Sequence, residues 1–285
     1  MKIRLALFSL LICAVACFGH RNAPATERPY WLTTEKDSLL AVQILSDLQP
    51  HAAESTAALM LMAGEALDGQ PYVGGTLEES ETEQLSIYLT RTDCILYVET
   101  CLALARTARA GGDFAALADE LRQSRYRNGR ISAYADRLHY TLEWARQGVR
   151  RGTLQDLTRE LGGIAYDHPV NYMSTFSKAY PRMDDVEAIR AAEARINAET
   201  FWYIPKSRLD KALRGIRTGD ILCLVSGVSG LDIAHVGMAV VDPDGTVRFR
   251  HASSAAHKVI LDPKPLSDYL ASRSKITGIQ IYRPL

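Results

Sequence analysis

The stretch AHVGMAVVDPDGTVRFRHASS, residues 234–254, decides the fold of this chain because it encodes a β-hairpin with a histidine near each end. Two runs of strand-forming residues, 236–241 and 247–249, flank the turn signal Asp-Pro-Asp-Gly at 242–245. A turn centred near Pro243 would place His235 directly opposite His251 on one face of the hairpin. A register shift of one residue would instead put the two rings on opposite faces, as two unrelated histidines at strand ends.

The composition is that of an ordinary globular protein with a sizeable core. The chain has 285 residues, of which 47% are hydrophobic, with 33 basic and 33 acidic side chains. No excess of positive charge indicates nucleic-acid binding, so we expect no nucleic-acid partner.

The N-terminus has the pattern of an export signal. Lys2 and Arg4 precede an apolar run over 5–16, which is too short for a permanent membrane span. The small residues at 14–16 fit a cleavage site after a signal peptide covering 1–16, while Cys17 directly after them also permits lipidation. We therefore expect an exported protein, either periplasmic or lipid-anchored through Cys17 in the bacterial cell envelope, with one domain over residues 30–285.

Helix signals dominate the first two thirds of the chain, and strand signals dominate the remainder. The spacing of apolar residues and the capping signals predict helices over about 35–49, 55–67, 93–110, 114–123, 137–148 and 184–198. Strands are predicted at 220–227, in the hairpin and at 275–284. This order predicts an α+β fold in which N-terminal helices pack on a mostly antiparallel sheet, with a helical insertion over about 113–200.

Cys94 lies in the first turn of the predicted helix TDCILYVETCLALARTAR, which Asp93 or Thr92 would cap. The positive end of a helix dipole favours thiolate over thiol, so we expect a lowered pKa for Cys94. Cys101 lies about 10 Å further along the helix, whereas a disulfide needs Cα atoms within about 7 Å. Cys94 is therefore a candidate nucleophile, and we interpret Cys101 and Cys223 as core residues.

A thiol at a helix start and two paired imidazoles on a hairpin are the components of a cysteine hydrolase. In this interpretation Cys94 is the nucleophile, His235 is the general acid and base, and His251 orients His235. The backbone N–H of Cys94 would supply part of an oxyanion hole, because first-turn amides have no partner inside the helix.

Five ordered motifs carry a resemblance to a known family. GQPYVGG at 69–75, DC at 93–94, RTGDILCLVSG at 217–227, AHVGMAVV at 234–241 and RHASS at 250–254 resemble the NlpC-type cell-wall cysteine hydrolases. DCILYVETCLALAR and RYRNGRISAYADRLHYTLEWA are most similar to the N-acetylmuramoyl-L-alanine amidase-like branch. The resemblance implies a papain-like fold, catalysis by Cys94, His235 and His251 without a cofactor or metal, and cleavage of the amide between N-acetylmuramic acid and L-alanine in muropeptides.

Six further residues are candidate substrate contacts. The resemblance places Tyr72 at a site-lining tyrosine and makes a substrate contact by His139 an option, while Gly74 permits close backbone approach. Arginines at 125, 130 and 137 form a basic group that we expect to be mostly solvent-exposed, and Arg130 is our choice for a contact with stem-peptide carboxylates. Asp93 and Asp232 complete the set, although Asp232 also fits a polar loop residue. The chain departs from the family at Val73, where tryptophan is usual, and at Ile95-Leu96, where small or hydroxyl residues are usual.

Three other functions remain open at this point. The same fold and triad would serve a γ-D-glutamyl-diaminopimelate endopeptidase, which cuts within the peptide. A zinc hydrolase could use Cys94, His235 and His251 as ligands, although the chain has no H-E-x-x-H motif. A non-catalytic envelope-binding lipoprotein would have no need of all three residues. We expect a monomer.

Overall fold

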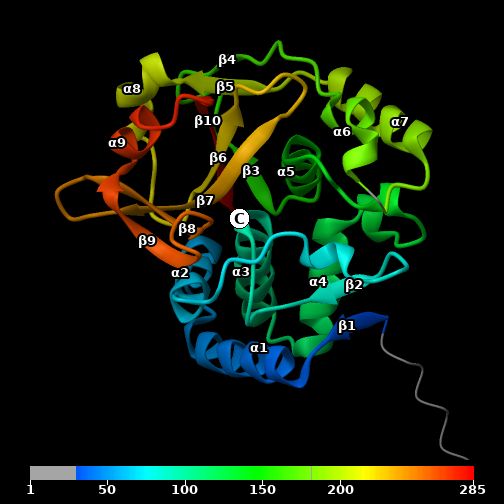
Figure 1. Ribbon diagram of the computed structural model, residues 1–285. Helices are drawn as coiled ribbons and strands as arrows, with labels where there is room; N and C mark the ends of the chain where they lie inside the picture. Colours follow the sequence, from blue (N-terminus) through cyan, green and yellow to red (C-terminus); the bar gives the residue numbers. More distant parts are fainter. Residues whose placement is uncertain (1–29, 181) are drawn as a thin grey trace, which may run out of the picture.

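An antiparallel sheet is the framework of the molecule (Figure 1). The computed structural model describes residues 30–180 and 182–285, so the predicted signal peptide over 1–16 and Cys17 lie outside the described residues. The sheet has eight strands in the described part of the chain, and its main path runs β4-β5-β10-β6-β7-β8-β9, with β3 also paired to β10. In chain order these strands are β3 (Leu154–Asp156), β4 (Ile164–Ala165), β5 (Trp202–Pro205), β6 (Ile221–Ser226), β7 (Ile233–Val241), β8 (Val247–Ser253), β9 (Lys258–Pro265) and β10 (Ile276–Pro284).

The helices surround α3, which is the most buried of the longer helices (Figure 1). The α-helices are α1 (Glu35–Leu48), α2 (Thr56–Ala66), α3 (Cys94–Arg109), α4 (Phe114–Arg125), α5 (Thr141–Arg150), α6 (Tyr172–Thr175), α7 (Val186–Asn197), α8 (Leu209–Leu213) and α9 (Leu266–Ala271). Two short strands, β1 (Trp31–Thr33) and β2 (Leu85–Ile87), form a separate parallel pair. The predicted α+β class and the long N-terminal helices are confirmed.

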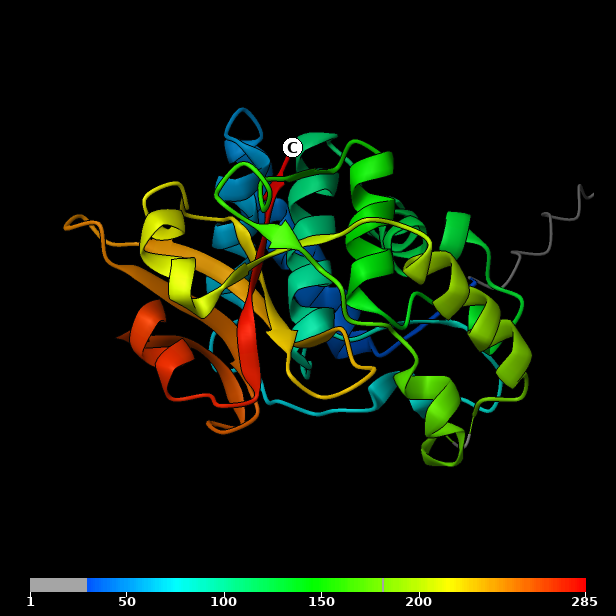
Figure 2. The same cartoon turned by 90° about the horizontal axis from the view of Figure 1, so that it is seen from above.

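Each face of the sheet covers its own hydrophobic core. Residues of α1 to α4 pack with the side chains of Val236 and Met238 on one face of β7. On the other face, Ala239 and Phe249 pack with α8 and α9. A third core lies among α5, α6 and α7. In Figure 2, β9 and α9 lie on one side of α3 and helices α6 and α7 on the other.

The predicted hairpin forms, but with a different register. Its strands pair Met238 with Arg250 and Val241 with Val247, so the turn is centred on Asp244. The prediction that His235 lies directly opposite His251 is therefore wrong. Because the change in register spans two residues, both rings stay on the same face as diagonal neighbours.

The segment 113–200 is more than a helical insertion. It contributes the strands β3 and β4 to the main sheet, and its helices α4 and α5 place Leu121 and Trp144 in the central core. The sequence did not predict these strands because each is only two or three residues long and pairs with a strand far along the chain. The segment is therefore integrated into the sheet and core rather than appended to them.

Candidate active site

Cys94 is the first residue of α3, and its position is fixed by the residue before it. Asp93 is the N-cap, and its Oδ1 accepts a hydrogen bond from the Leu96 N–H at 2.9 Å. The Cys94 side chain is partly buried at the junction of α3 with β7. The backbone N–H of Val236 on β7 lies close enough to the sulfur to lower the pKa of the thiol, although burial outweighs this effect. The thiol therefore lies beside the residue that directly follows His235.

The two histidines form a hydrogen-bonded pair. Nε2 of His235 lies 2.6 Å from Nδ1 of His251, and the rings are nearly perpendicular at 89°. Phe249 stacks on His251 with ring centroids 4.7 Å apart, and Tyr269 of α9 packs against its edge. Since Nε2 of His235 is occupied, Nδ1 is the nitrogen left to exchange a proton with a reacting group.

A small hollow opens onto this pair. Its volume is about 170 Å³, and its lining is Leu224, Ala234, His235, His251, Ser253, Ser254, Ala255, Tyr269, Arg273 and Ile276. Cys94 is not part of that lining, and no hydrogen bond joins Cys94 to His235 within the described residues. Catalytic hydrogen bonds are often long in ligand-free structures and tighten when substrate binds.

Strands β7 and β8 stop pairing before they reach His235 and His251. Pairing between β7 and β8 extends only to Met238 and Arg250, although both strands continue past these residues. Gly237 lies at this point, and a Cβ there would come within 2.6 Å of the Arg250 carbonyl oxygen and of the Phe249 ring. Gly237 therefore permits the close approach that places Phe249 beneath the imidazoles.

Burial keeps the three candidate catalytic groups neutral at pH 7. It raises the pKa of the Cys94 thiol to about 12, with a further contribution from the nearby Asp93 carboxylate. It also lowers the pKa of His235 to about 3 and that of His251 to about 4. The expected lowering of the Cys94 pKa by the helix dipole is wrong, because desolvation outweighs the backbone N–H groups that favour the thiolate.

Asp262 is a residue of this site that the sequence did not reveal. Its Oδ2 lies 3.8 Å from Nε2 of His251, a buried nitrogen that has no hydrogen-bond partner within the described residues. His251 is only 1% exposed, so this nitrogen has little access to water. An acidic residue in the strand sequence KVILDPKP was the available signal, but the pairing of β8 with β9 could not be read from it.

Three of the six predicted substrate contacts lie near Cys94. Asp93 is the residue before it, and its carboxylate caps α3. Tyr72 pairs with Thr92 through the backbone, and burial raises its pKa to about 12, with further contributions from Cys94 and Asp93. Gly74 lies exposed in the same loop, two residues further along. A Cβ at Gly74 would meet nothing closer than 4.0 Å, so the loop conformation itself does not require glycine there.

The other predicted contacts lie elsewhere and have local partners. Arg130 is largely exposed and bonds to Ser132. His139 bonds through Nε2 to the Tyr134 carbonyl oxygen at 2.8 Å. Asp232 is buried and accepts a hydrogen bond from the Leu142 N–H, and burial raises its pKa to about 6. None of these three side chains lines the hollow at His235.

The expectation that most of the three arginines are solvent-exposed is wrong. Arg125 is buried and forms an ion pair with Glu99 at 2.7 Å. Arg137 is also buried and contacts Glu78 and Glu83. Buried guanidinium groups need such partners, so the side chains of Arg125 and Arg137 are already paired within the fold around α4.

Two further findings concern metals and membranes. Within residues 30–180 and 182–285, no group of three His, Cys, Asp or Glu side chains is arranged to hold a metal ion. In the same part of the chain, no helix combines the length and apolar character needed to cross a bilayer.

Comparison with known proteins places the chain in a family of amidases. The model of the AmiA-like, N-acetylmuramoyl-L-alanine amidase-like family matches residues 62–279. The chain belongs to this family. The family supports a cell-wall amidase, a hydrolase that acts on a peptidoglycan-type substrate.

Two solved structures resemble the chain over most of its length, and one of them is named an amidase. An N-acetylmuramoyl-L-alanine amidase from Bacteroides uniformis is 33% identical, with a TM-score of 0.75 over 81% of this chain and 99% of that one. A proposed xylanase from Bacteroides fragilis is 32% identical, with a TM-score of 0.72 over 78% of this chain and 99% of that one. No curated protein matches the chain.

Proposed function

We propose that this protein is a thiol-dependent N-acetylmuramoyl-L-alanine amidase of the NlpC type, with a papain-like catalytic domain over residues 30–285. The observation that carries the proposal is the hydrogen-bonded pair of His235 and His251 on strands that pack against the helix beginning at Cys94. Family membership supports the substrate class, and the amidase from Bacteroides uniformis supports the scissile bond.

The first half of the reaction forms a thioester. Because the resting thiol and imidazole are both neutral, the proton moves from the Cys94 sulfur to Nδ1 of His235 as the sulfur attacks the lactyl carbonyl carbon. The backbone N–H of Cys94, which has no partner inside the helix, donates to the developing oxyanion. Collapse then breaks the C–N bond, and the L-alanine nitrogen takes the proton from His235.

The second half regenerates the thiol. A water molecule gives a proton to Nδ1 of His235 and attacks the thioester carbonyl carbon. The carbon–sulfur bond breaks, and the proton returns to the Cys94 sulfur. His251 holds the His235 ring through the 2.6 Å contact, so that Nδ1 stays available in both halves.

The remaining features of the proposal concern substrate and location. Tyr72 and Gly74 line the approach to Cys94, and muropeptides of the bacterial envelope are the substrates. The protein acts as a monomer without a cofactor. It is exported, and it is either free in the periplasm or anchored through Cys17.

Product identification tests the proposed bond. Purified protein is incubated with a defined disaccharide-peptide, and the products are identified by mass. We expect the free sugar acid and an intact stem peptide that begins with L-alanine. A peptide cut after the γ-D-glutamyl residue would instead indicate the endopeptidase, and the absence of any product would indicate a non-catalytic binding protein.

A further inference from the structure

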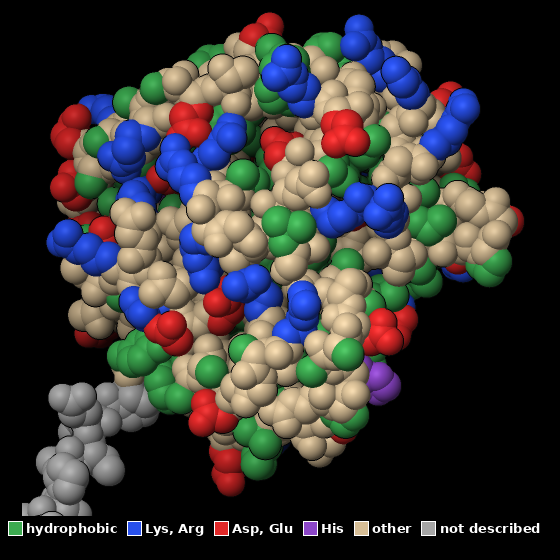
Figure 3. Space-filling view, turned by 180° about the vertical axis from the view of Figure 1, so that it is seen from behind, with side chains coloured by type: hydrophobic (Ala, Val, Ile, Leu, Met, Phe, Trp, Pro, Cys, Tyr) green, Lys and Arg blue, Asp and Glu red, His purple; other side chains and the backbone are tan. Residues whose placement is uncertain are grey.

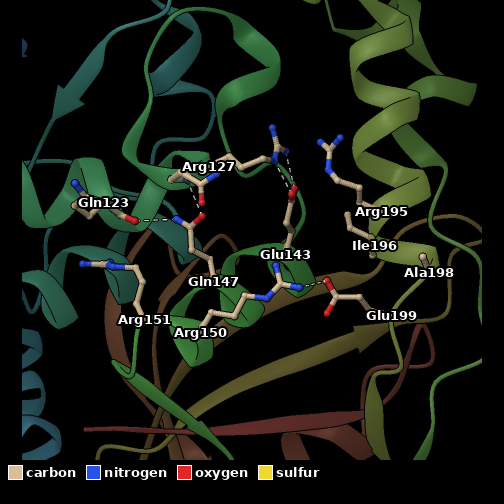
Figure 4. Close-up of a pocket in the computed structure, with 11 residues that line it drawn as sticks. Gln123, Arg127, Glu143, Gln147, Arg150, Arg151, Arg195, Ile196, Ala198 and Glu199 are labelled. Atoms are coloured by element: carbon tan, nitrogen blue, oxygen red, sulfur yellow. Dashed lines mark hydrogen bonds and ion pairs between the residues drawn. The ribbon is translucent and has the colours of Figure 1, made fainter.

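A second cavity lies away from Cys94. It has a volume of about 720 Å³ and lies between α4, α5 and the end of α7 (Figure 4). This volume is within the range of about 300–1,000 Å³ that is usual for small-molecule sites. Its lining is Gln123, Arg127, Asn128, Glu143, Gln147, Arg150, Arg151, Arg195, Ile196, Ala198 and Glu199. None of these residues belongs to the candidate active site.

The ion pairs around this pocket leave positive charge in excess. Three glutamates hold five arginines: Glu120 contacts Arg106 and Arg151, Glu199 contacts Arg146 and Arg150, and Glu143 contacts Arg127. A sixth arginine, Arg195, has no ion pair or hydrogen bond to any described residue. The group therefore carries three more positive than negative charges, in a chain whose formal net charge is zero. Figure 3 shows the Lys and Arg side chains on one face of the molecule interspersed with Asp and Glu side chains.

Two guanidinium groups face one another across the pocket. Figure 4 shows the side chains of Arg127 and Arg195 pointing toward each other from η3 (Arg127–Gly129) and α7. Glu143 already accepts hydrogen bonds from Nε and Nη2 of Arg127 at 2.7 and 2.8 Å, and Nη1 donates to the Ala135 carbonyl oxygen at 2.7 Å. One N–H on each terminal nitrogen of Arg127 is left for a ligand. Like charges held in this way are stabilised by an anion between them, and the planar guanidinium fork fits a carboxylate.

We propose that this pocket binds a short peptide that carries at least two carboxylates. One carboxylate lies between Arg127 and Arg195, and a second contacts the exposed Arg150. A volume of about 720 Å³ is larger than a bare inorganic ion needs, and Gln123 adds an amide side chain that can bond to a peptide backbone. The identity of the peptide rests on the proposed function, because the acidic stem peptide of peptidoglycan is the class that a cell-wall amidase meets.

The test is a binding measurement that does not depend on turnover. Isothermal titration uses the tripeptide L-alanyl-γ-D-glutamyl-diaminopimelate with the Cys94→Ala protein, at low and high salt. The second variant adds Arg195→Gln. The matched control adds Arg190→Gln instead, because Arg190 is an exposed arginine of the same helix whose partner is Glu187 outside the pocket.

We expect saturable, salt-sensitive binding that Arg195→Gln weakens about tenfold or more, as for loss of one charge-assisted hydrogen-bonded pair. Arg190→Gln should leave the affinity unchanged, and a peptide with amidated carboxyl groups should not bind. Equal affinities for the two arginine variants would overturn the proposal, as would phosphate binding that depends on Arg195 when the peptide does not bind. Because Cys94→Ala removes turnover from every sample, failure here is distinct from failure of the amidase assignment.

Discussion

At the scale of single residues, Asp262 determines which nitrogen of His251 carries the proton. If His235 is to accept a proton at Nδ1, its Nε2–H has to donate to Nδ1 of His251. The proton of His251 then lies on Nε2, which faces the Asp262 carboxylate at 3.8 Å. We therefore interpret Asp262 as a positioning residue that selects this tautomer, as the third member of a catalytic triad does for its histidine.

The variant Asp262→Asn tests this role. We expect kcat/KM to fall about tenfold or more, since part of the benefit of a correctly placed base is lost. Nitrogen-15 NMR should show a larger share of the other His251 tautomer, which loss of fold alone would not produce. Asp268→Asn changes an exposed acid of α9 and serves as the control. An unchanged tautomer ratio in Asp262→Asn would contradict the assignment.

The candidate catalytic residues were easier to predict from the sequence than the residues that contact them. Cys94, His235 and His251 could be identified because a helix cap and a hairpin turn are local signals. The 3.8 Å contact of Asp262 with His251 depends on the pairing of β8 with β9, whose register shifts between Arg248 and Arg250. The pKa of Cys94 was predicted in the wrong direction because burial by β7 cannot be read from α3 alone.

At the scale of elements, the first turn of α3 contributes to the stability of the fold and also holds Cys94 in place. The Asp93 cap fixes the first turn by accepting a hydrogen bond from the Leu96 N–H. The loop before β7 is also held by hydrogen bonds. Its Gly230 carbonyl oxygen accepts hydrogen bonds from the N–H groups of Asn171 and Tyr172, and Asp232 accepts one from Leu142. The segment 113–200 thus braces the strand that carries His235.

Comparison of two caps separates the structural and catalytic roles of Asp93. Asp93→Ala and Asp113→Ala each remove an aspartate cap, from α3 and α4 respectively. We expect each to lower the free energy of unfolding by about 1 kcal/mol, measured by urea denaturation. Only Asp93→Ala should also lower kcat, because it loosens the turn that holds Cys94. Equal activities of the two variants would show that this turn does not position the nucleophile.

At the scale of the whole molecule, buried neutral histidines make stability depend on pH. Burial, with a smaller contribution from Arg137, lowers the pKa of His139 to about 3. In the unfolded chain the pKa of a histidine is about 6.5. Between about pH 3 and pH 6.5 the unfolded chain therefore binds a proton at His139 that the folded chain does not bind. The contribution of His139 to stability is complete above about pH 6.5 and is lost as the pH falls toward 3.

The variant His139→Gln measures this effect. The advantage of the wild type over the variant in free energy of unfolding should shrink by about 2 kcal/mol between pH 7 and pH 5. His168→Gln, a change at an exposed histidine, is the matched control. A constant difference for His139→Gln would contradict the buried, neutral state of its ring. The sequence did not predict this state, since the partner of His139 is the Tyr134 carbonyl oxygen in an irregular segment.

The thiol mechanism is tested most directly by comparing two cysteine variants in one hydrolysis assay. Cys94→Ala and Cys101→Ala each remove a free thiol from α3, one at its start and one in the core. The disaccharide-peptide products are followed by mass spectrometry, with near-UV circular dichroism to establish that both variants are folded. We predict that Cys101→Ala releases the intact stem peptide and that Cys94→Ala releases none above the uncatalysed background. Release at the wild-type rate by folded Cys94→Ala would contradict a thiol mechanism at this site.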